Sequence, residues 1–182
     1  MKRSLGADTL ALPTPVWCVA AYDAEGRANA MTIAWGGICC SKPPMLTVAL
    51  RPATHTHGLI LKRKAFSVNV ADVAHAKEAD YFGMASGKDV DKFAATGLIA
   101  VKAKHVDAPV IQEFPVQIEC ELAHTHDAGL HTVFFGEIKD VFADEGVLKD
   151  GKLSMDLVDP LVFGTGTRGY FGIGEWIGKA FS

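Results

Sequence analysis

Long apolar runs are missing from this sequence, and no stretch is long enough to cross a lipid bilayer as a helix. The opening segment 1–22 resembles a secretory signal only faintly, because Asp8 and two prolines interrupt it and its apolar part alternates as in a strand. Clusters of basic residues are also missing, since the longest is "LKRK" (61–64) and the formal net charge is -3. We therefore expect a mature chain with no membrane span and no nucleic acid partner.

Cysteines are few, and their spacing is not that of a zinc site. The four stand at positions 18, 39, 40 and 120, and adjacent cysteines such as Cys39 and Cys40 rarely form a disulfide with each other. We expect buried free thiols in a reducing compartment, which favours the cytoplasm.

Repeats, linkers and low-complexity segments are absent as well, so we expect one domain, residues 1–182. Hydrophobic residues make up 49% of the chain and charged residues 21%, which is typical of a globular rather than a disordered protein. The sequence has no glycine-rich dinucleotide turn and no regular alternation of strand and helix patterns. Both absences disfavour a doubly wound α/β sheet.

What the sequence does contain is a series of short segments typical of β-strands. "TPVWCVAAY" (14–22), the turn "DAEG" and "NAMTIAW" (29–35) together predict a hairpin. Further strands are expected at 45–51, 65–71, 116–122 and 130–144, the last with a bulge at Gly136, and shorter ones at 152–155 and 160–164. Helices are expected at 58–64, 71–83, 88–97 and, in the tail, 173–181. The predicted fold class is mainly β, an antiparallel barrel with short helices inserted.

The stretch "RPATHTHGLI" (51–60) concentrates hydrogen-bond donors where a strand is expected to end and a helix to begin. The unpaired N–H groups at a helix start attract anions. Together with the guanidinium of Arg51, the hydroxyl of Thr56 and the imidazoles of His55 and His57, they would suit a phosphate. Two other interpretations stay open, namely plain N-capping by a threonine with exposed histidines and a metal site at the H-x-H pair, which has no carboxylate nearby in the sequence.

The stretch "NAMTIAWGG" (29–37) offers polar groups and a large ring to a planar ligand. Asn29 supplies an amide and Thr32 a hydroxyl, while Trp35 can cover a flat ring. Gly36 and Gly37 let a ligand approach the backbone closely. The alternative is that Trp35 lies in the core and the two glycines form a turn.

Two further residues are candidates for polar contacts with a ligand. Lys92, in "KDVDKF", is either a second cation for a phosphate or a solvated lysine of a charged helix. His131, just inside the strand expected at 130–144, is either a proton donor for a ligand or a structural histidine, since imidazoles titrate near neutrality.

Several blocks of the sequence, in their order and spacing, resemble one protein family. These blocks are "NAMTIAWGGICCSKPPMLTVALRPATHTHGLI", "FSVNV", "ADYFGMASGKDVDKF", "APVIQEFPVQIECEL" and "LHTVFFGEI". The sequence is similar to the flavin reductase-like, FMN-binding split-barrel proteins, and among them to flavoredoxin, from Leu12 to Tyr170. The resemblance implies a split β-barrel that pairs as a homodimer, with FMN near the subunit interface. The segment "ATHTH" departs from the flavoredoxin pattern, which tends to carry an aromatic or charged residue there.

Carried over residue by residue, the resemblance implies contacts to every part of FMN. The residues implied near the isoalloxazine and ribityl chain are Asn29, Thr32, Ala34, Trp35, Gly36 and Ser41. Those implied at the phosphate are Arg51, His55, Thr56, His57 and Lys92. His131 falls close to the flavin and is the candidate catalytic residue, and Phe163 or Tyr170 would flank the ring.

The activity that this resemblance implies is NAD(P)H-dependent flavin reduction, in which NADH or NADPH reduces FMN and the electrons pass to a further acceptor. One alternative is a flavoredoxin-type electron carrier that is reduced by a protein partner and has no nicotinamide site. Another is a flavin-binding module without a redox role. The strand "HTVFF" (131–135) and the tail "EWIGKAF" (175–181) are the expected contacts of the homodimer.

Overall fold

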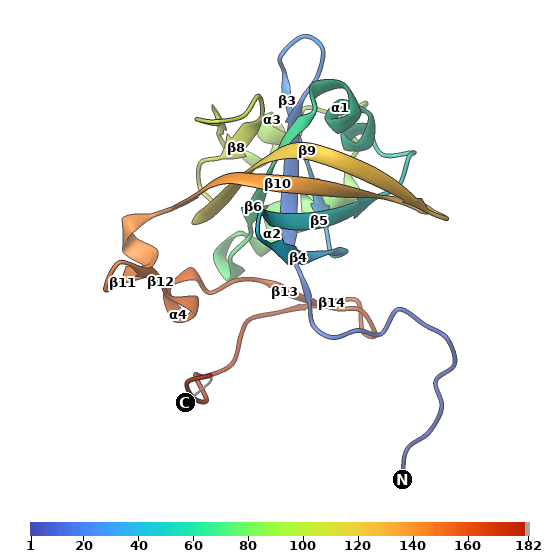
Figure 1. Ribbon diagram of the computed structural model, residues 1–182, viewed down its shortest axis with the longest axis vertical. Helices are drawn as coiled ribbons and strands as arrows, with labels where there is room; N and C mark the ends of the chain where they lie inside the picture. Colours follow the sequence, from blue (N-terminus) through green and yellow to red (C-terminus); the bar gives the residue numbers. More distant parts are fainter. Residues whose placement is uncertain (181–182) are drawn as a thin grey trace.

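A seven-stranded antiparallel sheet forms the centre of the computed structural model, which describes residues 1–180 (Figure 1). Its strands lie in the order β3-β2-β6-β9-β10-β5-β4, and every neighbouring pair is antiparallel. They are β2 (Trp17–Tyr22), β3 (Ala28–Ile33), β4 (Gly36–Ser41), β5 (Pro44–Leu50), β6 (Ala65–Val70), β9 (Val116–Ala128) and β10 (His131–Ala143). The prediction of a mainly β, antiparallel fold with short helices is confirmed.

The sheet curls so that its two edges approach each other. β3 leads through residues 34–35 into β4, the opposite edge, and the N–H of Ala49 in β5 donates to the carbonyl of Trp35 (2.9 Å). The predicted bulge at Gly136 is present as a register shift between β10 and β9. A Cβ at Gly136 would lie 2.5 Å from Cζ of Phe66, so the barrel interior requires a glycine there.

Smaller elements surround the barrel (Figure 1). Three short sheets consist of β1 (Thr14–Pro15), β13 (Val162–Gly164) and β14 (Gly169–Phe171); of β7 (Ala100–Lys102) and β8 (Pro109–Ile111); and of β11 (Leu148–Lys149) and β12 (Lys152–Leu153). The helices are α1 (His55–Arg63), α2 (Ala76–Met84), α3 (Lys92–Thr96) and α4 (Met155–Val158), with 3-10 turns η1 (Val73–His75) and η2 (Glu145–Val147). Among the described residues, no helix is both long and apolar enough to span a bilayer.

Local sequence signals account for the two ends of α3, which packs against α2 and β3. The carboxylate of Asp91 accepts a hydrogen bond from the N–H of Ala94 (3.0 Å) and so caps the first turn. Gly97 ends the helix with φ 75°, a left-handed conformation that glycine adopts without steric cost.

The core has two large parts and a smaller third cluster of Val116, Val147 and Val158. The barrel interior is filled by side chains that include Leu46, Phe66 and Phe134, all fully buried. Phe82 of α2 and Phe114 lie in the other part, which closes one face of β2 and β3. Each such buried aromatic contributes about 1.5–3 kcal/mol of hydrophobic stabilisation.

Several details differ from the sequence-based predictions. Residues 172–179 have no regular secondary structure, so the tail helix predicted at 173–181 is wrong for this part, and Phe181 lies outside the described residues. β3 ends at Ile33 instead of Trp35, and β4 is a strand where no strand was expected. All four cysteines are free, and Cys18 and Cys120 are buried as expected, but Cys39 is exposed and Cys40 is only partly buried.

Candidate functional site

Three adjoining cavities follow one side of β3, and together we call them the β3 groove. The corner cavity (about 280 Å³) lies between the start of α1 and residues 82–87. The strand cavity (about 210 Å³) and the aromatic cavity (about 240 Å³) continue the groove toward β13 and β14. Met31, Arg51 and Thr54 line both the corner and strand cavities, and Thr32, Ala34 and Phe163 are among the residues that line both the strand and aromatic cavities.

The start of α1 points its free N–H groups toward the corner cavity without a side-chain cap. The N-cap residue Thr54 donates its hydroxyl to the carbonyl of Arg51 (2.8 Å) instead of accepting from the helix. No acidic residue lies in the first turn. The guanidinium of Arg51 is exposed and makes no hydrogen bond or ion pair with the part of the chain that the structure describes. Uncapped N–H groups beside a free guanidinium suit an anion.

A buried hydrogen bond joins α1 to β3 beneath this corner. Asn29 donates from Nδ2 to Oγ1 of Thr56 (2.8 Å), and both side chains are buried. Gly87 lies directly on Asn29, since a Cβ at residue 87 would stand 1.8 Å from Oδ1. The sequence signal for this contact is the glycine in "MASGK", which lets the segment approach β3.

Lys92 is a buried cation at the boundary of the corner cavity. Its Nζ donates to the carbonyls of Ala30 and Phe82, both at 2.8 Å, and its side chain is 4% exposed. Burial lowers the pKa of Lys92 to about 8. No carboxylate among the described residues forms an ion pair with it, so its charge is uncompensated by the protein. The solvated-lysine alternative is wrong for this residue.

Aromatic and small polar side chains line the far end of the groove. Phe163 and Tyr170 pack at a centroid distance of 5.8 Å, and the phenol of Tyr170 donates to Asp80 (2.9 Å). Burial and this hydrogen bond to the carboxylate raise the pKa of Tyr170. The hydroxyl of Thr32 donates to the carbonyl of Ala79, and its oxygen lies 3.2 Å from Sγ of Cys18, so one lone pair of that oxygen is left to accept from a ligand.

The structure brings most of the candidate residues to the groove and separates four from its lining. Thr32, Ala34, Trp35, Arg51, His55, Thr56, Lys92, His131, Phe163 and Tyr170 line at least one of its cavities. Asn29 lies beneath it and lines a fourth cavity.

The other three candidates lie apart from the groove. His57 turns away from the groove, because its Nε2 lies 3.0 Å from Oγ1 of Thr132 and its ring packs on Phe134. Gly36 is pressed against Trp17, where a Cβ would stand 2.8 Å from the indole. Ser41 is exposed at the end of β4 and lines none of the groove cavities.

Sequence reasoning missed Met31, Thr54 and the segment 83–87. Met31 lies midway along β3 and lines both the corner and the strand cavities. The segment 83–87 forms one wall of the corner cavity, although its composition is small and apolar. Only the cluster of small residues in "GMASG" could have indicated a close backbone approach.

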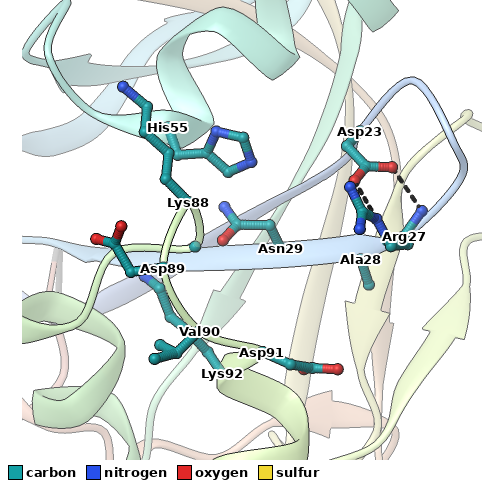
Figure 2. A pocket seen from close by; sticks show the side chains of 11 residues that line it. Asp23, Arg27, Ala28, Asn29, His55, Lys88, Asp89, Val90, Asp91 and Lys92 are labelled. Atoms are coloured by element: carbon teal, nitrogen blue, oxygen red, sulfur yellow. Dashed lines mark hydrogen bonds and ion pairs between the residues drawn. The ribbon is translucent and has the colours of Figure 1, made fainter.

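A fourth and larger cavity of about 480 Å³ adjoins the corner cavity, and we call it the outer cavity (Figure 2). It shares His55, Gly87 and Lys92 with the corner cavity. Figure 2 shows Asn29 between the His55 and Lys88 side chains on one side and the Asp23–Arg27 pair on the other.

Comparison with known proteins shows that the chain matches one protein family and several solved structures. Residues 9–172 match the flavin reductase like domain family. Flavoredoxin of Desulfovibrio vulgaris (Miyazaki F) is 48% identical, with a TM-score of 0.96 and coverage of 100% of this chain and 98% of that one. Flavoredoxin from Methanosarcina acetivorans is 27% identical, with a TM-score of 0.91 and coverage of 100% and 96%.

One relative known by sequence is longer than this chain. An uncharacterized protein of Aeropyrum pernix is 31% identical over 79% of this chain, and the match spans 55% of that protein's length. The predicted resemblance and the predicted split-barrel fold are confirmed by these matches.

Proposed function

The chain belongs to the flavin reductase-like family, and from this premise we propose that its β3 groove binds FMN for electron transfer. The residues of the corner cavity would hold the phosphate, and those of the strand and aromatic cavities, among them Trp35 and Phe163, would hold the isoalloxazine. NADH or NADPH reduces the flavin, and the electrons pass on to a further acceptor.

The observation that carries the proposal is the excess of positive charge at the corner cavity. The uncapped first turn of α1, the unpaired Arg51 and the buried Lys92 all direct positive charge to one place. No carboxylate among the described residues pairs with either cation. A phosphate dianion supplies the missing negative charge and satisfies the free N–H groups.

Each group of residues has a task in this function. Arg51 and the first turn of α1 hold the phosphate, and Lys92 adds attraction from behind while it fixes β3 to α2. Thr32 would accept a hydrogen bond from a ring N–H with the lone pair that Cys18 leaves free, because its own proton is committed to Ala79. His131 lines the strand cavity, where it would donate to the side of the ring that gains negative charge on reduction. Bound FMN supplies the hydride acceptor and the electron donor that the side chains lack.

A second function is favoured by the similarity to flavoredoxin of Desulfovibrio vulgaris (Miyazaki F). In this alternative the chain is an electron carrier whose FMN is reduced by a protein partner, without a nicotinamide site. The groove is used in the same way in both functions, and only the source of electrons differs.

The two functions are separated by mixing the purified, FMN-loaded protein with NADH or NADPH in a stopped-flow spectrometer. We expect the flavin absorbance to bleach rapidly with one of the two nucleotides. Bleaching that occurs only with a protein reductant would establish the carrier instead. A protein that binds FMN but is reduced by neither source would be a flavin-binding module, and one that takes up no FMN would contradict the whole proposal.

A homodimer is part of the proposal, as is a cytoplasmic location for a chain with four free thiols. The side chains of Trp176 and Ile177, in the tail that extends from the barrel, are 73% and 97% exposed (Figure 1). Exposed apolar side chains of this size favour burial against another subunit. β10 itself has no free edge, since it pairs with β9 and β5, so only its outer face is left for the contact expected of "HTVFF". Sizing by light scattering tests the dimer, and a monomer at micromolar concentration would contradict it.

A further inference from the structure

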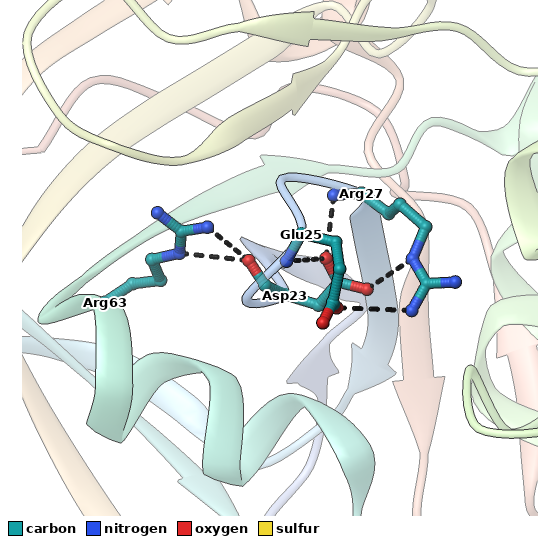
Figure 3. Close-up of polar contacts among 4 residues, drawn as sticks. All are labelled: Asp23, Glu25, Arg27 and Arg63. Carbon is teal, nitrogen blue, oxygen red and sulfur yellow. Dashed lines mark hydrogen bonds and ion pairs between the residues drawn. The ribbon is translucent and has the colours of Figure 1, made fainter.

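Cys39 and Cys40 carry adjacent thiols, and neither thiol forms a hydrogen bond with another residue in the described part of the chain. Many polar groups outside the β3 groove do have such partners, and the turn after β2 is an example (Figure 3). The carboxylate of Asp23 accepts from Nε of Arg27 at 2.7 Å, and its backbone carbonyl accepts from Nε of Arg63 at 3.1 Å. The two thiols, in contrast, are available to a ligand.

A β-bulge in β4 holds the two cysteines. Ile38 stands opposite Leu46 of β5, whereas Cys40 stands opposite Met45, so Cys39 is the additional residue. In a regular strand, successive side chains point to opposite faces of the sheet. At a bulge two residues oppose a single partner and the alternation is interrupted. The register therefore puts both thiols on the side of the sheet where their common partner, Met45, lies.

That partner adds a third sulfur. Met45 is half-buried, and it alternates along β5 with the fully buried Leu46, so its thioether lies on the outer face of the strand. Residues directly opposite each other have Cβ atoms about 5 Å apart, within reach of these side chains. Burial and then the neighbouring thiol of Cys40 raise the pKa of Cys39, as expected of two sulfurs close together. Two thiols and one thioether thus meet at the bulge.

Sulfur atoms of this kind select soft cations. Thiolates and thioethers favour Cu(I), whereas Mg²⁺ and Ca²⁺ take oxygen ligands and structural Zn²⁺ takes four ligands. No group of three or more histidine, cysteine, aspartate or glutamate residues in the described chain could hold a metal ion. Glu137, opposite Met45 on its other side, is already paired with Lys139 at 2.8 Å. The donor set is therefore sulfur alone, which suits Cu(I).

The bulge is open to solvent and separate from the β3 groove. β4 is an edge strand of the seven-stranded sheet, and Cys39 is exposed. Met45 lies near the start of β5, whereas Ala49 and Leu50, at the end of the strand, line the strand cavity. A cation can reach the sulfurs without entering the groove.

We propose that Cys39, Cys40 and Met45 form a binding site for Cu(I), with two thiolates and one thioether as its ligands. Binding replaces the thiol protons, which pass to solvent, and no atom changes its oxidation state. The positive charge between the two thiolates removes their mutual repulsion. The bound ion also joins β4 to β5 across the bulge.

The test is an anaerobic titration of the full-length protein with Cu(I), in competition with the coloured chelator bicinchoninate. We expect one tightly bound ion per chain. Cys39→Ser and Cys40→Ser should each weaken binding about 100-fold, because a chelating pair of thiolates is reduced to one. Met45→Leu keeps the volume of the side chain and should weaken binding about fivefold, since a thioether is the weaker ligand. Cys120→Ala, which removes a buried thiol, is the control and should leave the affinity unchanged.

A second measurement identifies the ligands directly. X-ray absorption at the copper edge should show three sulfur neighbours in the wild-type protein and two in Met45→Leu. A wild-type protein that loses Cu(I) to the chelator, or Cys39→Ser with wild-type affinity, would overturn the site. Met45→Leu with unchanged affinity and spectrum would overturn the three-sulfur arrangement. FMN affinity, measured on the same samples, should be equal in all variants, and a loss that parallels the loss of Cu(I) would contradict the separation from the groove.

Discussion

The contact between Gly87 and Asn29 makes a sharp prediction about the corner of the site. In Gly87→Ala the new methyl group would stand 1.8 Å from Oδ1 of Asn29 and 3.1 Å from Cδ2 of His55. Either the segment 83–87 must lift or the Asn29 amide must rotate out of its hydrogen bond with Thr56. Overpacking of this kind costs about 1–3 kcal/mol, and losing the net contribution of the buried hydrogen bond adds about 1 kcal/mol.

We therefore expect Gly87→Ala to lower the free energy of unfolding by about 1–3 kcal/mol if the segment lifts, and by about 2–4 kcal/mol if the hydrogen bond is also lost. Urea denaturation followed by tryptophan fluorescence measures it. Gly58→Ala is the matched control, since Gly58 lies in α1 with nothing within 4 Å of a built Cβ. That change should be neutral or should stabilise the protein by up to about 1 kcal/mol, because glycine is unfavourable inside a helix.

A double variant shows whether the two residues act through one contact. Asn29→Ala alone leaves Thr56 without its buried partner and should cost about 1–3 kcal/mol. Combined with Gly87→Ala it also removes the atoms that the new methyl group would strike. The double variant should then be more stable than the sum of the single effects by about 1–2 kcal/mol. Additive effects, or a Gly87→Ala protein as stable as the wild type, would refute the packing argument.

Two further predictions concern the phosphate. Arg51→Ala should weaken FMN binding about tenfold and leave riboflavin binding unchanged, because a charge-assisted hydrogen bond is lost only where a phosphate is present. Fluorescence titration measures both affinities, and an equal loss of affinity for both ligands would contradict this prediction. Since burial lowers the pKa of Lys92 from 10.5 to about 8, its charge is lost as the pH rises through 8, and the preference for FMN over riboflavin should fall there. Between these two pKa values the unfolded chain binds more protons, so the contribution of Lys92 to stability rises with pH over the same window. In Lys92→Met the ratio of the affinities for FMN and riboflavin should not change near pH 8. A change that still occurs in this variant would assign the effect to another titrating group.

Much of the barrel could be predicted because its signals are local. The alternation in "TPVWCVAAY" and the turn "DAEG" predict the hairpin of β2 and β3, and both strands were found. The glycine in "VFFGEI" predicts the bulge of β10, which faces Phe66 across the interior. β4 was missed because "GGICCS" has glycines that favour a turn, and only its pairing with β5 makes it a strand.

The types of residue in the candidate site could be predicted, but the sequence did not show which side chains face the groove. The donors of "RPATHTH" do gather at one corner, yet residues two apart on a helix face opposite ways. His55 therefore lines the corner cavity while His57 faces Thr132, and the sequence could not say which of the two would face the groove. The metal interpretation needed both imidazoles to converge, and they diverge.

The sequence by itself determined most strands of the barrel, the hairpin turn between β2 and β3, the family and the stretch that carries the donors, since each depends on residues that are neighbours along the chain. Only the tertiary structure decided that Lys92 is buried against the carbonyls of Ala30 and Phe82, and that Gly87 lies on Asn29. The contacts with β3 join residues 62 positions apart (Lys92 and Ala30) and 58 apart (Gly87 and Asn29), and Lys92 and Phe82 are 10 apart. Their existence depends on how α2, α3 and β3 pack together, and packing of distant elements leaves no periodic pattern in the sequence.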